Sequence, residues 1–423
     1  MLKKFQLAKY FKIKYFKIKY FKILFKKFVK LIIYILILPI VIILFLIKPV
    51  IHLRFASLDN SRFGPLLGNT RQYIREKIKN KKYTKVIDIM GYPSHSANQQ
   101  IEKMASRVFK VYKGAFFWGM IEKATFFWLR KKTFCVPSAV VLKDTNKILS
   151  EEPFLQFTDE EIKLGNELLL KLGIPKGSSW ICIHNRDSEY HNKFSNLNPI
   201  YKNFDWSYHS FRDFSPQTMV LAAEEFVKHG YYVVRMGKVV KEKLKSNNEK
   251  IIDYSSTSLR SDFFDVFLLA NCKAYFGSNA GISSCPKIFV KPVYYVNENL
   301  SQLSHLSLVH SGLFITKHIY DPKNKKYISL REMYECGLYK AATTQHFKDK
   351  GFEIISNSAE ELKDLAIEVK HEFNKKNYID DADAERQKKF WNIFKYYTPK
   401  KDYDEINLNI GYTFLRKNPY LLN

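Results

Sequence analysis

An apolar run that opens directly into polar residues is the feature that most constrains the fold. Residues 180–183 have the apolar, β-type composition of a buried strand, and His184, Asn185, Arg186 and Asp187 follow at once. Burying four polar side chains at the end of a strand costs free energy unless they have hydrogen-bond partners, so such a cluster suggests that they bind something. Ligands of open α/β sheets bind at the carboxyl ends of the strands. We therefore expect an active site where this strand ends.

The same strand-loop-helix unit recurs through the following part of the chain. Thr158 and Ser358 each stand three residues before a glutamate, which is the spacing of a helix capping box. The predicted helices are 159–172, 216–229, 261–271 and 359–373, and the predicted strands are 180–183, 231–235, 251–254, 273–276 and 292–296. Strands that alternate with helices of about 10–15 residues favour a parallel, doubly wound sheet.

The length of 423 residues suggests two α/β domains after an N-terminal segment. We expect two Rossmann-like domains with a cleft between them. The predicted limits are 50–157 for the first domain, whose last residues 144–157 are expected to be a linker, and 158–378 for the second domain. Residues 379–423 are expected to form helices that pack back across the domains.

The N-terminal segment has two parts. Residues 1–30 contain eleven lysines and no acid, with Lys-Tyr-Phe-Lys-Ile repeated from Lys9, Lys14 and Lys19. A five-residue repeat gives no clean amphipathic helix face, so this basic, aromatic segment is either a tolerated tail or a segment that lies on anionic lipid headgroups. Residues 31–47 are uncharged, and a helix over them would be about 25 Å long. Residues 31–48 are therefore predicted to form a membrane anchor helix.

The predicted location is the cytoplasmic face of the inner membrane. The lysines before the apolar run favour a cytoplasmic N-terminus, but Lys48, Arg54 and Arg62 make the other flank basic too. The five cysteines are widely spaced and odd in number, which suits a reducing compartment. Pro39 could kink the anchor helix so that it dips into the bilayer and returns. We therefore expect a cytoplasmic catalytic body with a monotopic or re-entrant anchor.

The net charge of +28 points to an anionic partner. Nucleic acid, anionic lipid and a phosphorylated substrate all fit a basic protein. The sequence has no helix-turn-helix, zinc-finger, RRM or KH pattern, which argues against nucleic acid. The charge therefore predicts an anionic membrane surface or a phosphorylated substrate as partner, and no oligomeric state is predicted.

If the sheet is parallel, the polar strand ends meet at one crevice. A glycine-rich turn that leads into a helix exposes backbone N–H groups, which suits a pyrophosphate, and arginines can add bidentate contacts. The turn lacks the Gly-Lys-Ser/Thr of a Walker A loop, so a nucleotide-diphosphate sugar fits better than ATP. The predicted donor-binding residues are Asn185, Arg186, Asp187, Arg235, Gly237, Lys238, Asp262, Gly277, Ser278, Asn279 and Gly281. Each also has a structural interpretation: the glycines can serve a tight turn and Asp262 can offset a helix dipole.

The acceptor side and the catalytic base are assigned from other loops. In the first domain, residues 59–65 are predicted to form a turn-rich loop and residues 69–79 a helix. Arg62 and Gly64 lie in that loop and Asn69 at the start of that helix, and His209 and Arg212 lie in an aromatic loop. These five are the predicted acceptor-side residues. His95, Asp59 and His184 are the candidate bases that could deprotonate an acceptor hydroxyl. Without a clear Asp-x-Asp pair, we expect no metal and no cofactor beyond the donor substrate.

Several of these motifs together resemble a family of bacterial proteins classed as glycosyltransferases. The motifs are His184-Asn-Arg-Asp-Ser-Glu-Tyr190, Tyr208-His-Ser-Phe-Arg-Asp213, Arg235-Met-Gly-Lys238, Asp253-Tyr254, Arg260-Ser-Asp-Phe263, Gly277-Ser-Asn-Ala-Gly281 and Phe414-Leu-Arg-Lys-Asn-Pro419. The resemblance covers roughly residues 50–423. That family is similar to GT-B enzymes and more distantly to O-fucosyltransferases. The resemblance implies a GT-B fold, in which 50–157 is the acceptor domain and 158–378 the nucleotide-sugar donor domain. It also implies that Arg186 meets the donor diphosphate.

One position departs from the family pattern. The resemblance leads us to expect Arg-Ile-Gly-His in the first-domain loop, whereas this chain has Arg62-Phe-Gly-Pro65. If the histidine of that pattern activates the acceptor, Pro65 cannot replace it. An altered acceptor, a different base or a lost activity all fit this change.

The sequence hypothesis is a membrane-associated, metal-independent glycosyltransferase that transfers a hexosyl or related sugar. The donor would be a nucleotide-diphosphate sugar, and the acceptor a lipid-linked or cell-surface glycan of polysaccharide biosynthesis. One alternative is a non-catalytic GT-B-like protein that binds glycan or nucleotide for assembly. Another is a basic module at the membrane surface that recruits nucleic acid or acidic polymers.

Overall fold

The computed structural model describes residues 2–79, 85–92, 95–112, 115–130, 134–135, 153–194, 206–306, 312–374, 379–399, 406 and 408–423. The chain forms two compact units. The smaller unit spans 1–58, 76–93 and 110–138, and the larger spans 59–75, 94–109 and 139–423. Two segments of the predicted first domain, 59–75 and 94–109, therefore belong to the larger unit. The segment 144–157, predicted as a linker, lies mostly outside the described residues.

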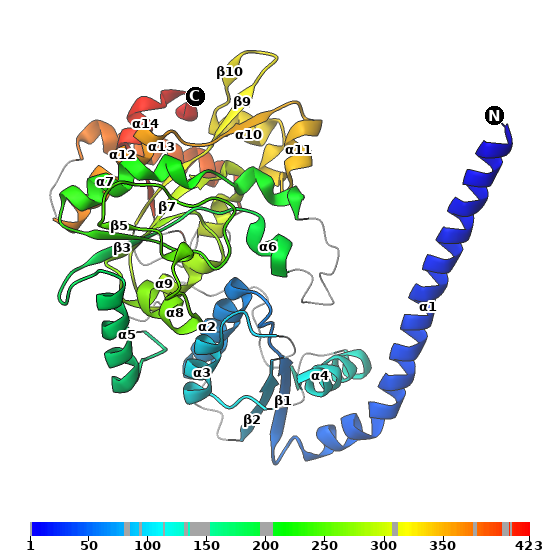
Figure 1. Cartoon of the computed structure of the whole chain (residues 1–423). Coiled ribbons are helices and arrows are strands. Elements are labelled where there is room, and N and C mark those ends of the chain that lie inside the picture. The colour runs from blue at the N-terminus through cyan, green and yellow to red at the C-terminus, as the bar shows by residue number, and fades with distance from the viewer. Residues whose placement is uncertain are drawn as a thin grey trace. The chain divides into compact units, whose positions relative to one another are not determined.

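A seven-stranded parallel sheet forms the centre of the larger unit (Figure 1). The strands, in their order across the sheet, are β12 (Asn409–Ile410), β8 (Leu313–Thr316), β7 (Val293–Glu298), β6 (Ala274–Gly277), β3 (Trp180–His184), β4 (Tyr232–Arg235) and β5 (Ile251–Ile252). The sequence prediction of an α/β fold with a parallel sheet is confirmed. The chain runs from β3 to β4 and β5 on one side and then returns to β6 on the other. The strand order therefore switches between β3 and β6, where ligands of open sheets bind.

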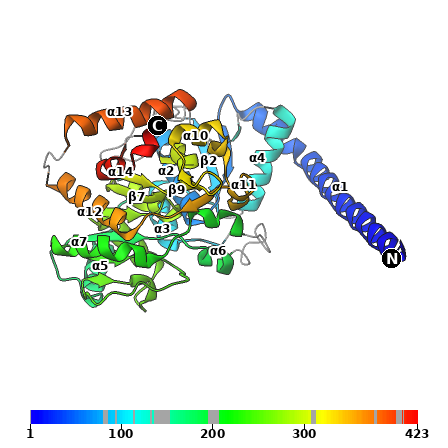
Figure 2. The same ribbon diagram turned by 90° about the horizontal axis from the view of Figure 1, so that it is seen from above.

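Helices cover both faces of this sheet (Figure 1). On one face lie α7 (Val220–Lys228) and α12 (Ala359–Phe373), and on the other lie α5 (Asp159–Lys171), α8 (Asp262–Asn271) and α9 (Ser284–Ile288). Figure 2 looks down on the first layer, where α13 (Asp381–Tyr397) and α14 (Tyr412–Lys417) continue beyond α12. The sheet is thus doubly wound. Its central strands β6 and β7 are buried along their whole length, as expected of a sheet covered on both faces.

Short elements complete the larger unit. A small antiparallel sheet has the order β10 (Lys326–Tyr327), β9 (His318–Asp321) and β11 (Glu353–Ile355). The remaining α-helices are α2 (Phe63–Lys79), whose last turn belongs to the smaller unit, α3 (Gln99–Val108), α6 (Glu189–Phe194), α10 (Leu330–Glu335) and α11 (Thr344–Asp349). The 3₁₀ helices are Ser207–Arg212, Pro216–Met219, Tyr254–Ser256, Gly281–Ser283, Leu300–Leu306, Leu338–Lys340 and Pro419–Leu422.

The capping residues predicted from the sequence begin helices in the structure. Thr158 and Ser358 each accept a hydrogen bond from the N–H of the glutamate three residues later and form a complete capping box. Pro216 begins a 3₁₀ turn rather than the α-helix itself, which starts at Val220. The strand predicted to reach Tyr254 ends at Ile252, because the Asp253 carboxylate accepts from Leu244 N and bonds Ser255 and Ser256 in a turn.

The helix that follows the predicted turn at 59–65 begins earlier than expected. We predicted a start at Asn69, but α2 begins at Phe63, so Gly64 and Pro65 lie in its first turn. Proline is tolerated there because the first turn has no intrahelical acceptor for its missing N–H. Gly64 and Pro65 therefore lie at the beginning of the helix and do not extend the preceding loop.

The smaller unit contains two parallel strands and two long helices. β1 (His52–Ser57) pairs with β2 (Val86–Gly91), and the Arg54 guanidinium binds Asp88 on the neighbouring strand at 2.6 and 2.9 Å. α1 (Leu2–Ile47) continues unbroken past Pro39, and α4 (Ala115–Leu129) packs against it. One helical segment among the described residues, Leu24–Ile47, is long and apolar enough to cross a membrane.

The packing of α5 on α8 predicts opposite effects for two helical glycines. A Cβ on Gly165 would clash with the buried ring of Phe267, whereas a Cβ on the exposed Gly68 in α2 would meet no atom within 4 Å. Gly165→Ala is expected to lower the free energy of unfolding by about 1–2 kcal/mol, because overpacking outweighs the gain in helix propensity. Gly68→Ala is expected to raise it by up to about 1 kcal/mol.

Urea denaturation followed by circular dichroism measures both values. Gly68→Ala is the matched control, since it makes the same change inside a helix without a neighbour. A Gly165→Ala variant as stable as the Gly68→Ala variant would contradict the observed α5–α8 contact.

Candidate active site

A cavity of about 710 Å³ lies at the sheet edge where the strand order switches. Every residue that lines it belongs to the larger unit. They come from the start of α2, from residues 97–98, from the ends of β3 and β4, and from the turn after β6. The volume lies within the range of small-molecule sites, about 300–1,000 Å³. The cavity is therefore the candidate active site.

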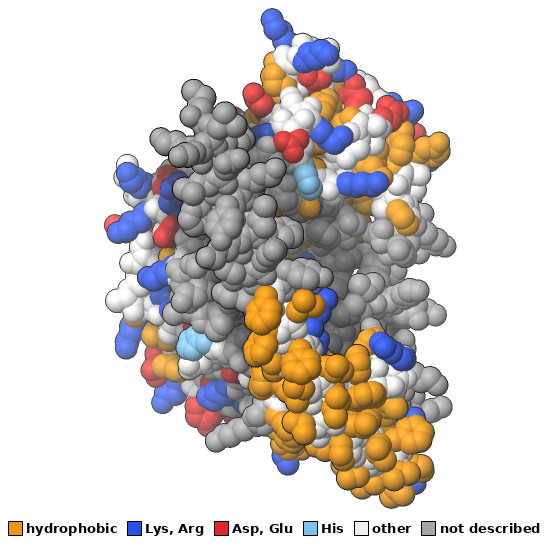
Figure 3. Space-filling view, turned by 90° about the vertical axis from the view of Figure 1, so that its right-hand side faces the viewer, with side chains coloured by type: hydrophobic (Ala, Val, Ile, Leu, Met, Phe, Trp, Pro, Cys, Tyr) orange, Lys and Arg blue, Asp and Glu red, His pale blue; other side chains and the backbone are white. Residues whose placement is uncertain are grey.

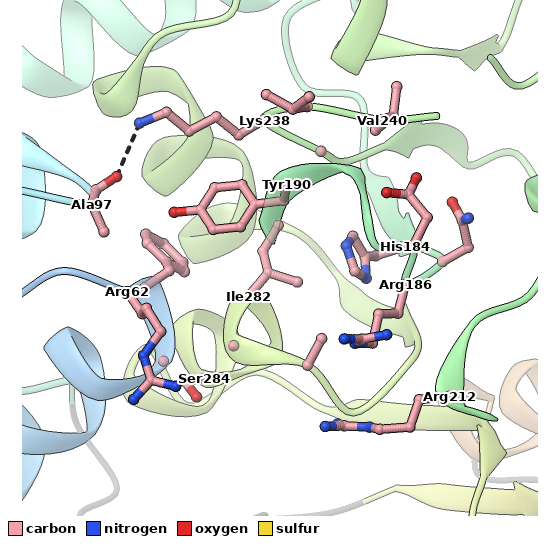
Figure 4. A pocket seen from close by; sticks show the side chains of 18 of the residues that line it. Arg62, Ala97, His184, Arg186, Tyr190, Arg212, Lys238, Val240, Ile282 and Ser284 are labelled. Carbon is pink, nitrogen blue, oxygen red and sulfur yellow. Dashed lines mark hydrogen bonds between the residues drawn. The ribbon is translucent and has the colours of Figure 1, made fainter. Parts of the chain in front are cut away.

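Basic side chains dominate the ionisable groups of the cavity. Arg62, Arg186, Arg212 and Lys238 line it, together with two carboxylates, Asp187 and Asp265. In Figure 4, Arg186 and Arg212 lie on one side of Tyr190 and Arg62 on the other. This excess of positive charge favours an anionic ligand.

Arg186 is held in place at the end of β3 by the loop that follows. Its Nη1 donates to the carbonyl of His209 at 3.1 Å and also to the Asp213 carboxylate. Among the described residues both contacts use Nη1, so the remaining N–H groups of the fork can reach a ligand. The nearby Arg212 donates through Nη2 to the carbonyl of Asn279. Two arginines from one loop region are thus fixed at the cavity before any ligand binds.

A buried lysine supports that loop from behind. Lys317 follows β8 and is 3% exposed. Its Nζ donates to the carbonyl of Asp213 at 2.7 Å and to Ser356 Oγ at 3.0 Å. Burial, together with the nearby Arg186 and Arg212, lowers the pKa of Lys317 to about 8, although Asp213 acts in the opposite direction. Lys317 therefore positions the backbone next to Arg186.

Lys238 closes another wall of the cavity. Its Nζ lies 3.0 Å from the carbonyl of Ala97 (Figure 4). It also lies 3.1 Å from Asp262 Oδ1. The other oxygen of Asp262 accepts the backbone N–H of Gln99 at the start of α3, 2.9 Å away. Asp262 thus joins α3, α8 and Lys238 and does not itself line the cavity.

The two cavity histidines are neutral at physiological pH. Burial, together with Arg235 and Arg186, lowers the pKa of His184 to about 3, and its Nδ1 lies 2.9 Å from Ser278 Oγ. Burial and the surrounding arginines lower the pKa of His209 to about 4. Such weakly basic imidazoles suit hydrogen bonding better than proton abstraction. The positive charge of the cavity therefore comes from arginine and lysine.

Arg235 lies behind the cavity wall instead of on it. Its side chain is fully buried and donates to Asn185 Oδ1 at 2.9 Å, to Asp253 Oδ1 at 3.2 Å and to Ser255 Oγ at 2.6 Å. Asn185 in turn donates to the carbonyl of Phe214 at 3.0 Å. The guanidinium is 0% exposed and is not among the residues that line the cavity. Arg235 is therefore a positioning residue for Asn185.

Glycines allow three segments of backbone to meet at the cavity. A Cβ on Gly281 would lie 2.9 Å from the backbone N of Gly64, and a Cβ on Gly64 would lie 3.0 Å from the Cα of Gly281. A Cβ on Gly277 would clash with the backbone of His184 on the neighbouring strand. Glycine is needed at these positions because a side chain would not leave room for the two backbones to approach this closely.

Asp265 is the most unusual carboxylate of the cavity. It is 8% exposed, its Oδ2 accepts from Arg260 at 2.9 Å, and its Oδ1 is buried without a hydrogen-bond partner in the described residues. Burial raises the pKa of Asp265 to about 6, although Arg260 and the Tyr254 hydroxyl act in the opposite direction. A buried carboxylate of raised pKa that lines a cavity is typical of functional sites.

The structure brings together most of the predicted site residues. The predicted residues that line the cavity are Arg62, Gly64, His184, Asn185, Arg186, Asp187, His209, Arg212, Gly237, Lys238, Asn279 and Gly281. Those that do not line it are Asp59, Asn69, His95, Arg235, Asp262, Gly277 and Ser278. Asp59 accepts from Ser61 and lies 3.5 Å from Arg62, whereas His95 is solvent-exposed. As catalytic bases these two remain predictions from the sequence.

Sequence reasoning did not assign several residues of the cavity wall. These are Phe63, Pro65, Ala97, Asn98, Tyr190, Trp206, Tyr208, Val239, Val240, Asp265, Ala280, Ile282 and Ser284. Tyr190 and Tyr208 lie within motifs that we quoted, so their positions could have been added. The apolar residues carry no signal in the sequence, because an apolar side chain is equally at home in the core. Among the described residues, no three His, Cys, Asp or Glu side chains cluster as a metal site.

Comparisons with known proteins give fold similarity at low identity. No protein-family model and no curated protein matches the sequence. The ADP-heptose LPS heptosyltransferase II of E. coli is 12% identical with a TM-score of 0.37, covering 62% of this chain and 90% of that chain. A glycosyl transferase family 9 structure from Veillonella parvula is 12% identical with a TM-score of 0.31. This match covers 72% of the present chain and 78% of the Veillonella chain. At these values the similarity carries no argument about function, which must rest on the cavity.

The raised pKa of Asp265 predicts a pH dependence of stability. The folded protein holds this proton more tightly than the unfolded chain, whose carboxyl has a pKa near 3.8. The stabilisation is therefore fully present below about pH 4 and is lost as pH rises through about 6. Relative to Asp265→Asn, the wild type is expected to lose about 3 kcal/mol of unfolding free energy between pH 4 and 7.

Urea denaturation at several pH values between 4 and 7 measures this difference. Asp381→Asn is the control, because Asp381 is an exposed carboxylate in the first turn of α13. A constant gap between wild type and Asp265→Asn across this range would rule out the assigned shift.

Proposed function

We propose that the protein is a membrane-associated glycosyltransferase that uses a nucleotide-diphosphate sugar. The observation that carries this proposal is the cavity at the switch point, which combines four basic side chains with a glycine-containing turn. The excess of positive charge matches a diphosphate, and aromatic and apolar residues of the wall, such as Trp206 and Tyr208, suit a nucleoside.

Arg186 is the principal ligand of the donor diphosphate in this proposal. It is 6% exposed and anchored through Nη1 to Asp213 and His209, so its planar fork is already oriented. A fixed, largely desolvated guanidinium loses little entropy when it binds phosphate oxygens. Arg212 and the backbone around Asn279 and Gly281 supply further donors.

The reaction breaks the bond between the anomeric carbon and the diphosphate oxygen and forms a bond from that carbon to an acceptor oxygen. Negative charge develops on the leaving diphosphate, and Arg186 and Arg212 stabilise it in the transition state. No step requires a metal or a further cofactor in this scheme. The acceptor is a lipid-linked or cell-surface glycan, reached from the cytoplasmic face of the membrane.

The acceptor hydroxyl must also lose its proton. Among the cavity residues, Asp265 is the best proton acceptor, since it lines the cavity and its pKa of about 6 suits a base near neutral pH. His184, with a pKa of about 3, is a weaker base and serves better as a hydrogen-bonding residue. Asp59 and His95 stay as alternatives outside the cavity wall.

Nucleotide titration tests the donor site. Isothermal titration calorimetry with UDP, GDP and ADP is expected to show that one of them binds. Arg186→Ala should weaken it by about 10- to 100-fold, because a hydrogen bond to a charged group contributes about 1.5–3 kcal/mol. Arg331→Ala, on the exposed surface of α10, should leave the affinity unchanged. Equal affinities of the wild type and Arg186→Ala would remove the central claim.

Sugar transfer separates an enzyme from a binding protein of the same fold. With the matching nucleotide sugar, the wild type should release nucleotide diphosphate, and Asp265→Asn should lower this rate while nucleotide affinity is retained. Nucleotide binding without release of product, even with membrane glycolipid added as acceptor, would favour a non-catalytic assembly protein.

A further inference from the structure

One side of the apolar part of α1 packs against other elements of the protein. Tyr34, Ile37, Val41 and Leu44 recur at helical spacing on α1, and each is at most 7% exposed. They pack into a core with Ile121 and Ala124 of α4 and with Phe55 of β1. The indole N–H of Trp128 also donates to the carbonyl of Tyr34 at 2.9 Å. The middle of the apolar segment is therefore part of the core of the smaller unit.

This packing is incompatible with a helix that crosses a bilayer. If Val41 lay at the bilayer centre, the strand residue Phe55 beside the same core would enter the hydrocarbon with its neighbour Arg54 and the ion pair to Asp88. Open sheet edges and surface ion pairs are strongly unfavourable in hydrocarbon. As long as the α1–α4–β1 core persists, α1 has only one side available to lipid.

That available side is a continuous apolar surface with a contribution from α4. On α1 the side chains of Leu36, Leu46 and Phe45 are 72%, 69% and 60% exposed, and on α4 Phe116 and Phe126 are 76% and 45% exposed. Figure 3 shows hydrophobic side chains gathered over one part of the molecule. A soluble monomer rarely exposes so large an apolar surface patch.

The charges around this surface identify its partner. Exposed lysines Lys26, Lys27 and Lys30 precede the apolar stretch of α1, Lys48 follows it, and exposed Arg130 ends α4. Apolar residues flanked by basic side chains are the pattern of a segment that lies at an anionic lipid interface. A second copy of the chain would bring the same cations to the contact, so repulsion disfavours it.

We propose that α4 is a second membrane-contacting helix and that α1 and α4 together lie in one leaflet of an anionic bilayer, approximately parallel to its plane. The protein is then held on the membrane without a spanning helix. In this arrangement Phe116, Phe117 and Phe126 insert among the lipids beside the exposed side of α1. The proposal does not depend on the glycosyltransferase assignment.

Vesicle flotation with the full-length protein tests the role of α4. The wild type should float with mixed phosphatidylcholine–phosphatidylglycerol vesicles and much less with pure phosphatidylcholine. Phe116→Glu combined with Phe126→Glu should lower the partition coefficient about tenfold, equivalent to about 1.4 kcal/mol. The control is Ile162→Glu combined with Leu170→Glu, which changes two exposed apolar residues on α5 of the larger unit.

Protease protection tests the orientation of α1. With tags at both ends and vesicles kept intact, both tags should be cleaved by protease added outside. A protected N-terminal tag would show a spanning helix and overturn the proposal. Unchanged flotation of the α4 variant, or a loss of self-association without any loss of flotation, would overturn the role of α4 as well.

Discussion

A fully buried guanidinium, that of Arg235, connects the ends of three neighbouring strands. It follows the apolar part of β4 and binds Asn185 after β3 and Asp253 after β5. A buried cation without partners costs several kcal/mol, so this network must form whenever the sheet forms. Because Asn185 immediately precedes Arg186, the same network determines where the cavity wall begins. The structure of the site thus depends on a residue that does not touch a ligand there.

The cavity combines this rigid wall with close backbone packing. Gly64 of α2 meets Gly281 after β6, and Gly277 passes the backbone of His184. These approaches bring residues separated by about one hundred to two hundred positions to one small volume. The charge of the cavity is also independent of histidine titration near neutral pH, because His184 stays neutral beside its arginines. Together these features favour a preorganised site for an anionic ligand.

The sequence predicted those parts of the fold that depend on local patterns. The strand at Trp180–His184, the helix starts at Thr158 and Ser358, and the parallel sheet all followed from apolar periodicity and capping residues. The cavity position also followed, since parallel strands must end at one edge. Arg186 could be chosen because it comes directly after a buried strand.

The sequence by itself determined the sheet, its polar edge and the apolar N-terminal helix, because each depends on the order of neighbouring residues. Only the tertiary structure decided which polar side chains face the cavity and which face inward. Arg235 is held inside the wall by Asn185 and Asp253, whereas Asp265 lines the cavity. The tertiary structure also decided that α1 is covered by α4 on one side. The physical reason is that hydrogen-bond partners and packing neighbours come from distant segments, which no local pattern specifies.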